Sequence, residues 1–148
     1  WYRVDEVGYQ LVAKANPRQA SRAYTYFSTI NPEIPEAYEA VGDLFYQTGE
    51  ERQGVREWEQ ALRYPGETRN RVANKLGEHY INMGQAALAK AQENPAARDI
   101  ELERALHNFE QALQYNRGSN EAVGMITETN EAIRERNEQR KLTMNLVT

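Results

Sequence analysis

The chain repeats a pattern of apolar, small and aromatic residues at an interval of 34 positions, and this period constrains its fold more than any other feature. Val7-Gly8 is followed by Val41-Gly42 at that interval. The further matched pairs are Leu11 with Phe45, Tyr24 with Trp58, and Phe27 with Ala61. Periods of about 20–50 residues are typical of repeat proteins, in which each unit buries its apolar face by stacking on its neighbour.

A third, longer copy of the unit follows the first two. Gly77 lies 35 positions after Gly42. Phe109, in the second half of the copy, lies 51 positions after Trp58, so 16 residues have been added between the halves. The added segment, about 85–100, is rich in alanine and other strong helix formers. We expect it to add about two turns to each of two helices and so to form a protruding helical hairpin; the alternative is a flexible loop.

Each half of a unit predicts one amphipathic helix. Val41, Leu44 and Phe45, for example, recur at the three- and four-residue spacing that places side chains on one helix face. Three dipeptides are typical of helix boundaries. Asn16-Pro17 and Asn94-Pro95 each predict the start of a helix, and Thr48-Gly49 predicts the end of one. The expected helices cover 2–15, 18–29, 35–47, 51–63, 69–93, 96–115 and 119–141, followed by a tail over 142–148.

Composition and charge exclude several classes of protein. With 18 Lys+Arg against 22 Asp+Glu the net charge is −4, so we expect no nucleic-acid partner, because backbone binding needs dense positive charge. No apolar run approaches the roughly 18 residues of a membrane span. The chain has no Cys, and its 9 Gly and 5 Pro are too few to favour a many-stranded β fold or disorder. Because it opens at Trp1 without an initiator Met, we expect it to be trimmed or part of a longer protein.

These residues together resemble the tetratricopeptide repeat (TPR) family. The matches are Val7, Gly8, Leu11, Ala20, Tyr24 and Pro32 in 1–34; Tyr38, Val41, Gly42, Phe45, Trp58 and Ala61 in 35–68; and Leu76, Gly77, Tyr80, Ala105, Phe109 and Ala112 in 69–118. The sequence departs from the pattern at Phe27 and Gly54, where Ala is usual, and in the insertion. The resemblance implies an all-α, right-handed solenoid in a single domain over 1–148. It would contain three αα-hairpins and a capping helix over 119–141.

Glycines and aromatic residues give this pattern a physical reason. Small residues at Gly8, Gly42 and Gly77 are expected to let the two helices of a hairpin approach closely. Large aromatic residues are expected to fill the space between successive hairpins: Tyr24, Trp58 and Phe109.

The resemblance also implies a ligand site, namely a concave groove in which family members bind a peptide or a helix of another protein. The groove positions are held by Tyr2, Asp5, Glu6, Tyr9, Val12 and Ala13; by Glu36, Glu39, Ala40, Asp43, Tyr46 and Gln47; and by Arg71, Asn74, Lys75, Glu78, Ile81 and Asn82. Six are acidic and two basic, so we expect a basic or amphipathic partner and solvated carboxylates. The alternative is a solvated helical face with no dedicated ligand.

One family subtype clamps the C-terminal carboxylate of its partner, and this chain does not fit it. Arg71 and Lys75 match the basic residues of that clamp, but Asp5, Tyr9 and Ala40 stand where its Lys and Asn residues belong.

A ladder of arginines marks the opposite, convex side. Arg18, Arg22, Arg52 and Arg56 occupy the same two positions of successive second helices. Such a ladder is compatible with an acidic protein or an anionic membrane surface. Interleaved acids such as Glu51 and Glu57 favour a plain solvated face.

No pattern of catalytic residues emerges. There is no Cys, and His79 and His107 lack metal-ligand spacing. The sequence therefore predicts a non-catalytic protein-interaction scaffold without cofactor or metal. The alternative is a structural module that self-assembles into homo-oligomers through its ends. Those ends carry Trp1, Leu142, Met144, Leu146 and Val147.

The lengthened third hairpin leaves one question for the structure. Leu88, Ile100 and Leu102 lie in or beside the added segment, and Ile126 and Ile133 of the capping helix are placed to cover them. Complete cover would make the extension a stabilising buttress. Partial cover would make the hairpin tip a second interaction site.

Overall fold

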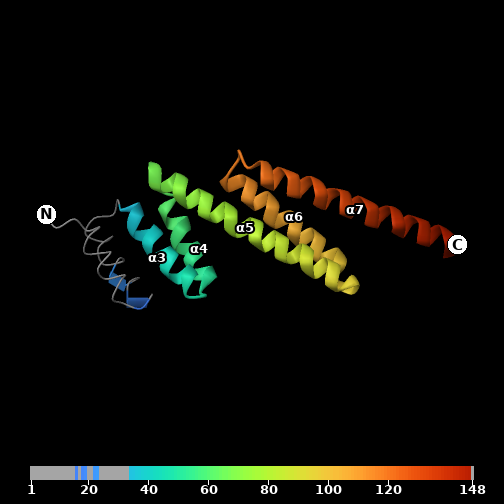
Figure 1. The fold of residues 1–148 in the computed structure, drawn as a ribbon, viewed down its shortest axis with the longest axis horizontal. Coiled ribbons are helices and arrows are strands. Elements are labelled where there is room, and N and C mark those ends of the chain that lie inside the picture. Colours follow the sequence, from blue (N-terminus) through green and yellow to red (C-terminus); the bar gives the residue numbers. More distant parts are fainter. Residues whose placement is uncertain (1–15, 17, 20–21, 24–33, 148) are drawn as a thin grey trace. The chain divides into compact units, whose positions relative to one another are not determined.

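The computed structural model describes residues 16, 18–19, 22–23 and 34–147, and all regular structure in these ranges is helical. Its elements are α3 (Pro35–Gln47), α4 (Glu51–Ala61), α5 (Glu67–Glu93), the short 3₁₀ helix η1 (Pro95–Ala97), α6 (Arg98–Tyr115) and α7 (Asn120–Val147) (Figure 1). No strand occurs in the described ranges, so the expectation of an all-α chain is confirmed. Two compact units, Trp1–Ala73 and Asn74–Thr148, make up the chain, and α5 contributes residues to both.

In the N-terminal unit, α3 and α4 pack together where two glycines meet. A Cβ atom on Gly42 would overlap the indole ring of Trp58. One on Gly54 would lie 2.8 Å from the carbonyl oxygen of Gly42, and all three residues are buried. Since no side chain fits at either position, the prediction that Gly42 permits a close helix approach is confirmed.

The turn between α3 and α4 has the predicted ending. Thr48 is the C-cap of α3, and its hydroxyl donates to the carbonyl of Leu44 at 3.0 Å. Gly49 follows with φ of 89°, a left-handed conformation that costs glycine little and other residues much.

Both predicted Asn-Pro helix starts fall partly or wholly within the described residues. The side chain of Asn94 accepts a hydrogen bond from the N–H of Ala96 at 3.1 Å, and Pro95 opens η1. The side chain of Asn16 likewise accepts from the N–H of Gln19 at 2.9 Å. The expected helix over 2–15 lies outside the described residues.

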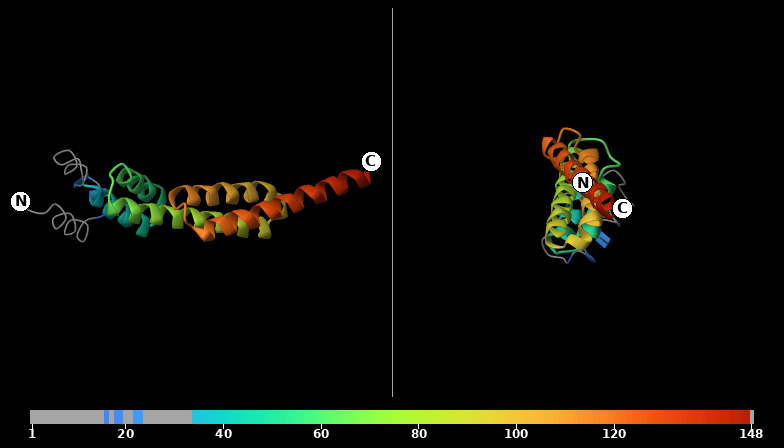
Figure 2. Two further views of the ribbon diagram at one scale, coloured as in Figure 1. Left: turned by 90° about the horizontal axis from the view of Figure 1, so that it is seen from above. Right: turned by 90° about the vertical axis from the view of Figure 1, so that its right-hand side faces the viewer.

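In the C-terminal unit, α6 and α7 lie side by side (Figures 1 and 2). A buried cluster joins α5 to α6 through Ala87, Ala105 and Phe109, and α7 covers it with Met125 and Ile126. Two of these buried residues, Phe109 and Ala105, have no exposed surface. The cluster is therefore the core that holds α7 against the other two helices.

The close approach of α5 and α6 occurs at Gly84 and not at Gly77. A Cβ atom on Gly84 would overlap the ring of Phe109, whereas one on Gly77 would find its nearest neighbour 3.6 Å away, an ordinary contact. The prediction that Gly77 has this role is wrong. The inserted helical residues move Phe109 along α6, so that it meets α5 two helical turns beyond the repeat position.

The 16-residue insertion is helical, as expected, apart from the turn at its tip. α5 continues to Glu93, and α6 begins at Arg98 after η1. The apolar residues of this extension are only partly covered, because Leu102 is 4% exposed whereas Ile100 is 59% exposed. A pocket of about 410 Å³ remains near the tip, with Leu88, Ala91, Leu102 and Ala132 among its lining residues.

The capping helix runs further than the sequence pattern indicated. α7 reaches Val147, whereas the expected end was 141. No Gly or Pro interrupts its last two turns, so nothing in the sequence terminates it. Arg136 and Arg140 form ion pairs with Asp99 at the start of α6. Beyond these pairs α7 extends past the ends of α5 and α6 (Figure 1).

Candidate functional site

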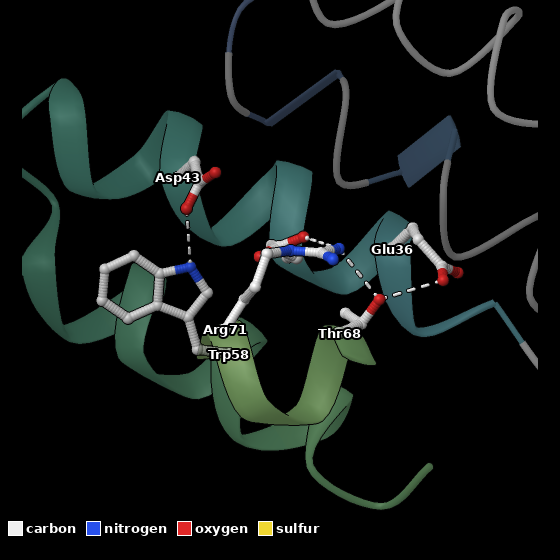
Figure 3. A network of polar contacts seen from close by, with 6 residues as sticks. Glu36, Asp43, Trp58, Thr68 and Arg71 are labelled. Carbon is white, nitrogen blue, oxygen red and sulfur yellow. Dashed lines mark hydrogen bonds and ion pairs between the residues drawn. The ribbon is translucent and has the colours of Figure 1, made fainter. Parts of the chain in front are cut away.

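The predicted groove residues of α3 do share one side of that helix. Glu36, Glu39, Asp43 and Tyr46 are spaced by three, four and three residues. Glu36 and Glu39 contact the beginning of α5, and Asp43 contacts the Trp58 side chain of α4 (Figure 3). Tyr46 also stacks on Trp58. The site in the N-terminal unit is therefore built by three helices.

Arg71 of α5 binds Glu39 of α3 through two hydrogen bonds. Nε donates to Oε2 at 3.2 Å and Nη2 donates to Oε1 at 2.9 Å. This two-pronged geometry is the strong form of an arginine–carboxylate pair. Hydrogen bonding to Glu39, followed by attraction to the same carboxylate, raises the pKa of Arg71 above its ordinary value. The guanidinium therefore remains charged.

Thr68 connects this ion pair to a second carboxylate. Its hydroxyl donates to Oε1 of Glu36 at 2.9 Å and accepts from Nη2 of Arg71 at 3.0 Å (Figure 3). Thr68 is buried, while Glu36 is exposed. The network therefore runs from a buried hydroxyl out to a carboxylate at the surface.

An aromatic pair adjoins the network. The indole N–H of Trp58 donates to Oδ1 of Asp43 at 3.0 Å, and Tyr46 stacks on the indole ring with centroids 4.8 Å apart. Because Trp58 is 4% exposed, Asp43 satisfies a polar group that would otherwise be buried without a partner.

Carboxylates on this face do not all stay solvated, contrary to expectation. Glu39 is 9% exposed and Asp43 is half-buried. A buried carboxylate is stable only when it is paired and hydrogen-bonded, and Arg71 provides that pairing. These two acids therefore bind the neighbouring helices, and Glu36 is the α3 acid that a ligand reaches most easily.

The charge of this face is nevertheless negative. Glu67, the first residue of α5, is exposed and acts electrostatically on Arg71, as Glu36 does. We call the set of Glu36, Glu39, Asp43, Glu67 and Arg71 the acidic face. Four carboxylates against one guanidinium give it a net charge of −3.

The predicted groove residues further along α5 lie beyond the N-terminal unit. Asn74, Glu78 and Asn82 are exposed and Lys75 is half-buried, and all four belong to the C-terminal unit. Tyr2, Asp5 and Tyr9 lie outside the described residues.

Three residues that matter here were not predicted as site residues: Trp58 as a hydrogen-bond donor, Thr68 and Glu67. A signal for one of them exists in the sequence. Glu36 and Thr68 are 32 residues apart, as are Glu39 and Arg71, so two contacts link α3 to α5 at one offset. No such pattern marks the Trp58–Asp43 bond.

Metal ligation and membrane insertion have no candidate residues in the part of the chain that the structure describes. The described residues contain no group of three or more His, Asp or Glu residues placed to hold a metal ion. Among the helices that the structure describes, none combines the length and the apolar character needed to cross a membrane. No model of a known protein family matches the chain, and no curated protein matches its sequence significantly.

Proposed function

We propose that the chain is a non-catalytic protein-interaction scaffold of the TPR type, which binds a basic or amphipathic peptide or helix on its acidic face. The observation that carries this proposal is the net charge of −3 of the acidic face, whose five residues lie on α3 and the first turns of α5. Such a surface raises the local concentration of cationic segments and speeds their capture.

The TPR assignment rests on the agreement between the period and the helix packing. The 34-residue interval that relates Gly8 to Gly42 places a residue without a side chain where α3 meets Trp58. In the longer hairpin, Gly84 has the same relation to Phe109. We propose that α3 with α4, and α5 with α6, are successive hairpins of a right-handed solenoid that α7 caps.

The acidic face offers different groups to a ligand at its edge and at its centre. Glu36 and Glu67 are exposed and able to pair with Lys or Arg side chains of a ligand. Tyr46, near the other end of α3, stacks on Trp58 and offers an aromatic surface for apolar and cation–π contacts. Glu39 is already held by Arg71, so it fixes the shape of the face and does not need to contact the ligand.

Binding of two peptides tests this proposal. A fluorescein-labelled amphipathic helix with Lys on its polar side is titrated with the full chain, alongside the same sequence with Glu in place of every Lys. We expect the Lys peptide to bind at least about tenfold more tightly at low salt, and the difference to shrink as salt screens the charges. Equal affinity for the two peptides would contradict the proposal.

A second candidate function, self-assembly through the end of α7, is supported by one observation. Leu142, Met144, Leu146 and Val147 are all more than 60% exposed on the part of α7 that extends past α6. Exposed apolar residues grouped on one helix end are typical of protein contacts. Light scattering over a dilution series tests this alternative, since a monomer at all concentrations would exclude it.

A further inference from the structure

A wide cleft in the N-terminal unit is lined by all four arginines of the predicted ladder. Arg18 and Arg22 are helical and four residues apart, and Arg52 and Arg56 are four residues apart on α4. The cleft has a volume of about 650 Å³, and its other lining residues are Phe45, Gly49, Glu50, Glu51 and Gln53. Two pairs that are 34 residues apart in the sequence are thus brought to one concave surface.

The charge of this cleft is opposite to that of the whole chain. Four guanidinium groups and two carboxylates give the lining a net charge of +2, against −4 for the chain. Within the described residues, one ion pair lies inside the cleft, between Nη2 of Arg18 and Oε1 of Glu50 at 4.0 Å. Both side chains are well exposed, at 82% and 48%, and such a pair contributes little stability. A stronger acceptor can therefore replace Glu50.

We infer that this arginine cleft binds an acidic segment of a partner protein, with oxyanions at every second residue. Guanidinium groups bind carboxylates and phosphates through two parallel hydrogen bonds, which gives arginine an advantage over lysine at such sites. The N-terminus of α4 lies at the cleft, and no side chain caps it. Its partial positive charge adds to the attraction for an anion.

The spacing of the arginines indicates the spacing of the acidic groups. Residues four apart on a helix are separated by about 6 Å along its axis. Alternate residues of an extended chain are separated by about 6.6 Å and point to the same side. Each arginine pair therefore matches an extended segment of the form acid-x-acid, in which the acid is Asp, Glu or a phosphorylated residue.

The same cleft is poorly suited to a long polyanion. Glu50 and Glu51 in the lining repel a continuous row of phosphates, and the rest of the chain is acidic. A short segment with an acid only at every second position carries fewer charges and is repelled less. Among anionic partners, the lining therefore favours a peptide over nucleic acid.

Peptide titrations with the full chain test this inference. Fluorescein-labelled extended peptides carry Glu, phosphoserine or Gln at alternate positions. We expect the Glu and phosphoserine peptides to bind and the Gln peptide not to bind; tighter binding of one acidic peptide identifies carboxylate or phosphate as the preferred group. Inorganic phosphate alone is expected to compete weakly, because it occupies one arginine pair at a time.

Variants connect the binding to the cleft. Arg52→Gln/Arg56→Gln is expected to weaken acidic-peptide binding at least about tenfold, since charge-assisted hydrogen bonds are lost. Arg63→Gln/Arg69→Gln is the matched control, because both residues are exposed in the same unit and line no part of the cleft. We expect this control to bind within about twofold of the wild type. Circular dichroism verifies that each variant keeps its helices, and Arg18→Gln/Arg22→Gln provides an independent pair.

A charge-preserving variant completes the test. Arg52→Lys/Arg56→Lys keeps the charge but loses the paired geometry, so we expect an affinity between those of the wild type and the Gln variant. Equal losses in the Arg63→Gln/Arg69→Gln control would overturn the inference. So would binding of the Gln peptide as tight as that of the acidic peptides, or a Lys variant that binds as the wild type does.

Discussion

Arg71 and Glu39, 32 residues apart in sequence, join α5 to α3 through two hydrogen bonds of 3.2 and 2.9 Å. The Glu39 side chain is 11% exposed and the Arg71 side chain 50% exposed, so the pair lies at the edge of the core and not on the open surface. Glu39, which the repeat pattern predicts to lie in a ligand groove, is therefore a contact between helices. The acidic face depends on this pair for its shape.

Removing the arginine should destabilise the protein. We expect Arg71→Met to lower the free energy of unfolding by about 1–2 kcal/mol, because Glu39 loses two charge-assisted hydrogen bonds while remaining mostly buried. The half-exposed arginine keeps the cost below that of a fully buried pair. Urea unfolding measures the change.

The pair can be isolated with two further variants. Arg69→Met, an exposed arginine on the same helix, should change stability by less than about 0.5 kcal/mol. Glu39→Met/Arg71→Met should recover part of the loss, because no charge then remains buried without its partner. A double variant no more stable than Arg71→Met alone would show that the pair does not act as described.

Two glycines at equivalent positions of the repeat should respond in opposite directions to alanine. Gly42→Ala pushes a methyl group into Trp58 and should cost about 1–3 kcal/mol. Gly77→Ala, on α5, meets only ordinary contacts with Ala112 and Asn116 and should stabilise the protein by about 0.5–1 kcal/mol, through the better helix propensity of alanine. Chemical unfolding of both variants measures the two changes. A cost at Gly77 as large as that at Gly42 would contradict the packing at Gly84.

Glu57 should give the protein a small pH dependence. Burial raises the pKa of Glu57 above its ordinary value, and a hydrogen bond from Gln53 partly opposes this effect. The folded state thus binds the proton more tightly than the unfolded state. The stability from this group is present below the ordinary pKa of glutamate and is lost as the pH rises through the raised pKa.

We therefore expect Glu57→Gln to raise the Tm at pH 7 and to lose this advantage at pH 4. Thermal unfolding followed by circular dichroism measures both values. Glu110→Gln, at an exposed position of α6, is the control and should show no such difference. A Glu57→Gln variant that is less stable than the wild type at pH 7 would show that the charged form is favoured by the fold.

The sequence predicted helices well because its local signals agree with one another. Periodic apolar residues, the Thr48-Gly49 stop and the Asn94-Pro95 start each act over a few residues, and each matches the structure. The role of Gly84 could not be predicted from the repeat alone, because the insertion changes which turn of α5 meets Phe109. That contact depends on the relative position of two helices and not on a local pattern.

Site residues were harder to interpret than helices for a related reason. Position in the repeat placed Glu39 and Asp43 on one side of α3, and in the structure these two acids contact Arg71 and Trp58. It did not indicate that α5 and Trp58 would approach closely enough to bury them, since burial is set by tertiary packing. A charge count from sequence treats all six predicted groove acids alike, whereas the structure separates exposed Glu36 from paired Glu39.

The affinity of the Lys peptide for two double variants, each with a matched pair of substitutions, tests the central claim most directly. Glu36→Gln/Glu67→Gln removes the two exposed carboxylates of the acidic face, and Glu110→Gln/Glu131→Gln removes two exposed carboxylates from α6 and α7. The account predicts that the first pair weakens binding at least about fivefold and flattens its salt dependence, while the second pair leaves both within about twofold of the wild type. Equal losses in the two pairs, or no loss in the first, would contradict the claim that the acidic face is the ligand site.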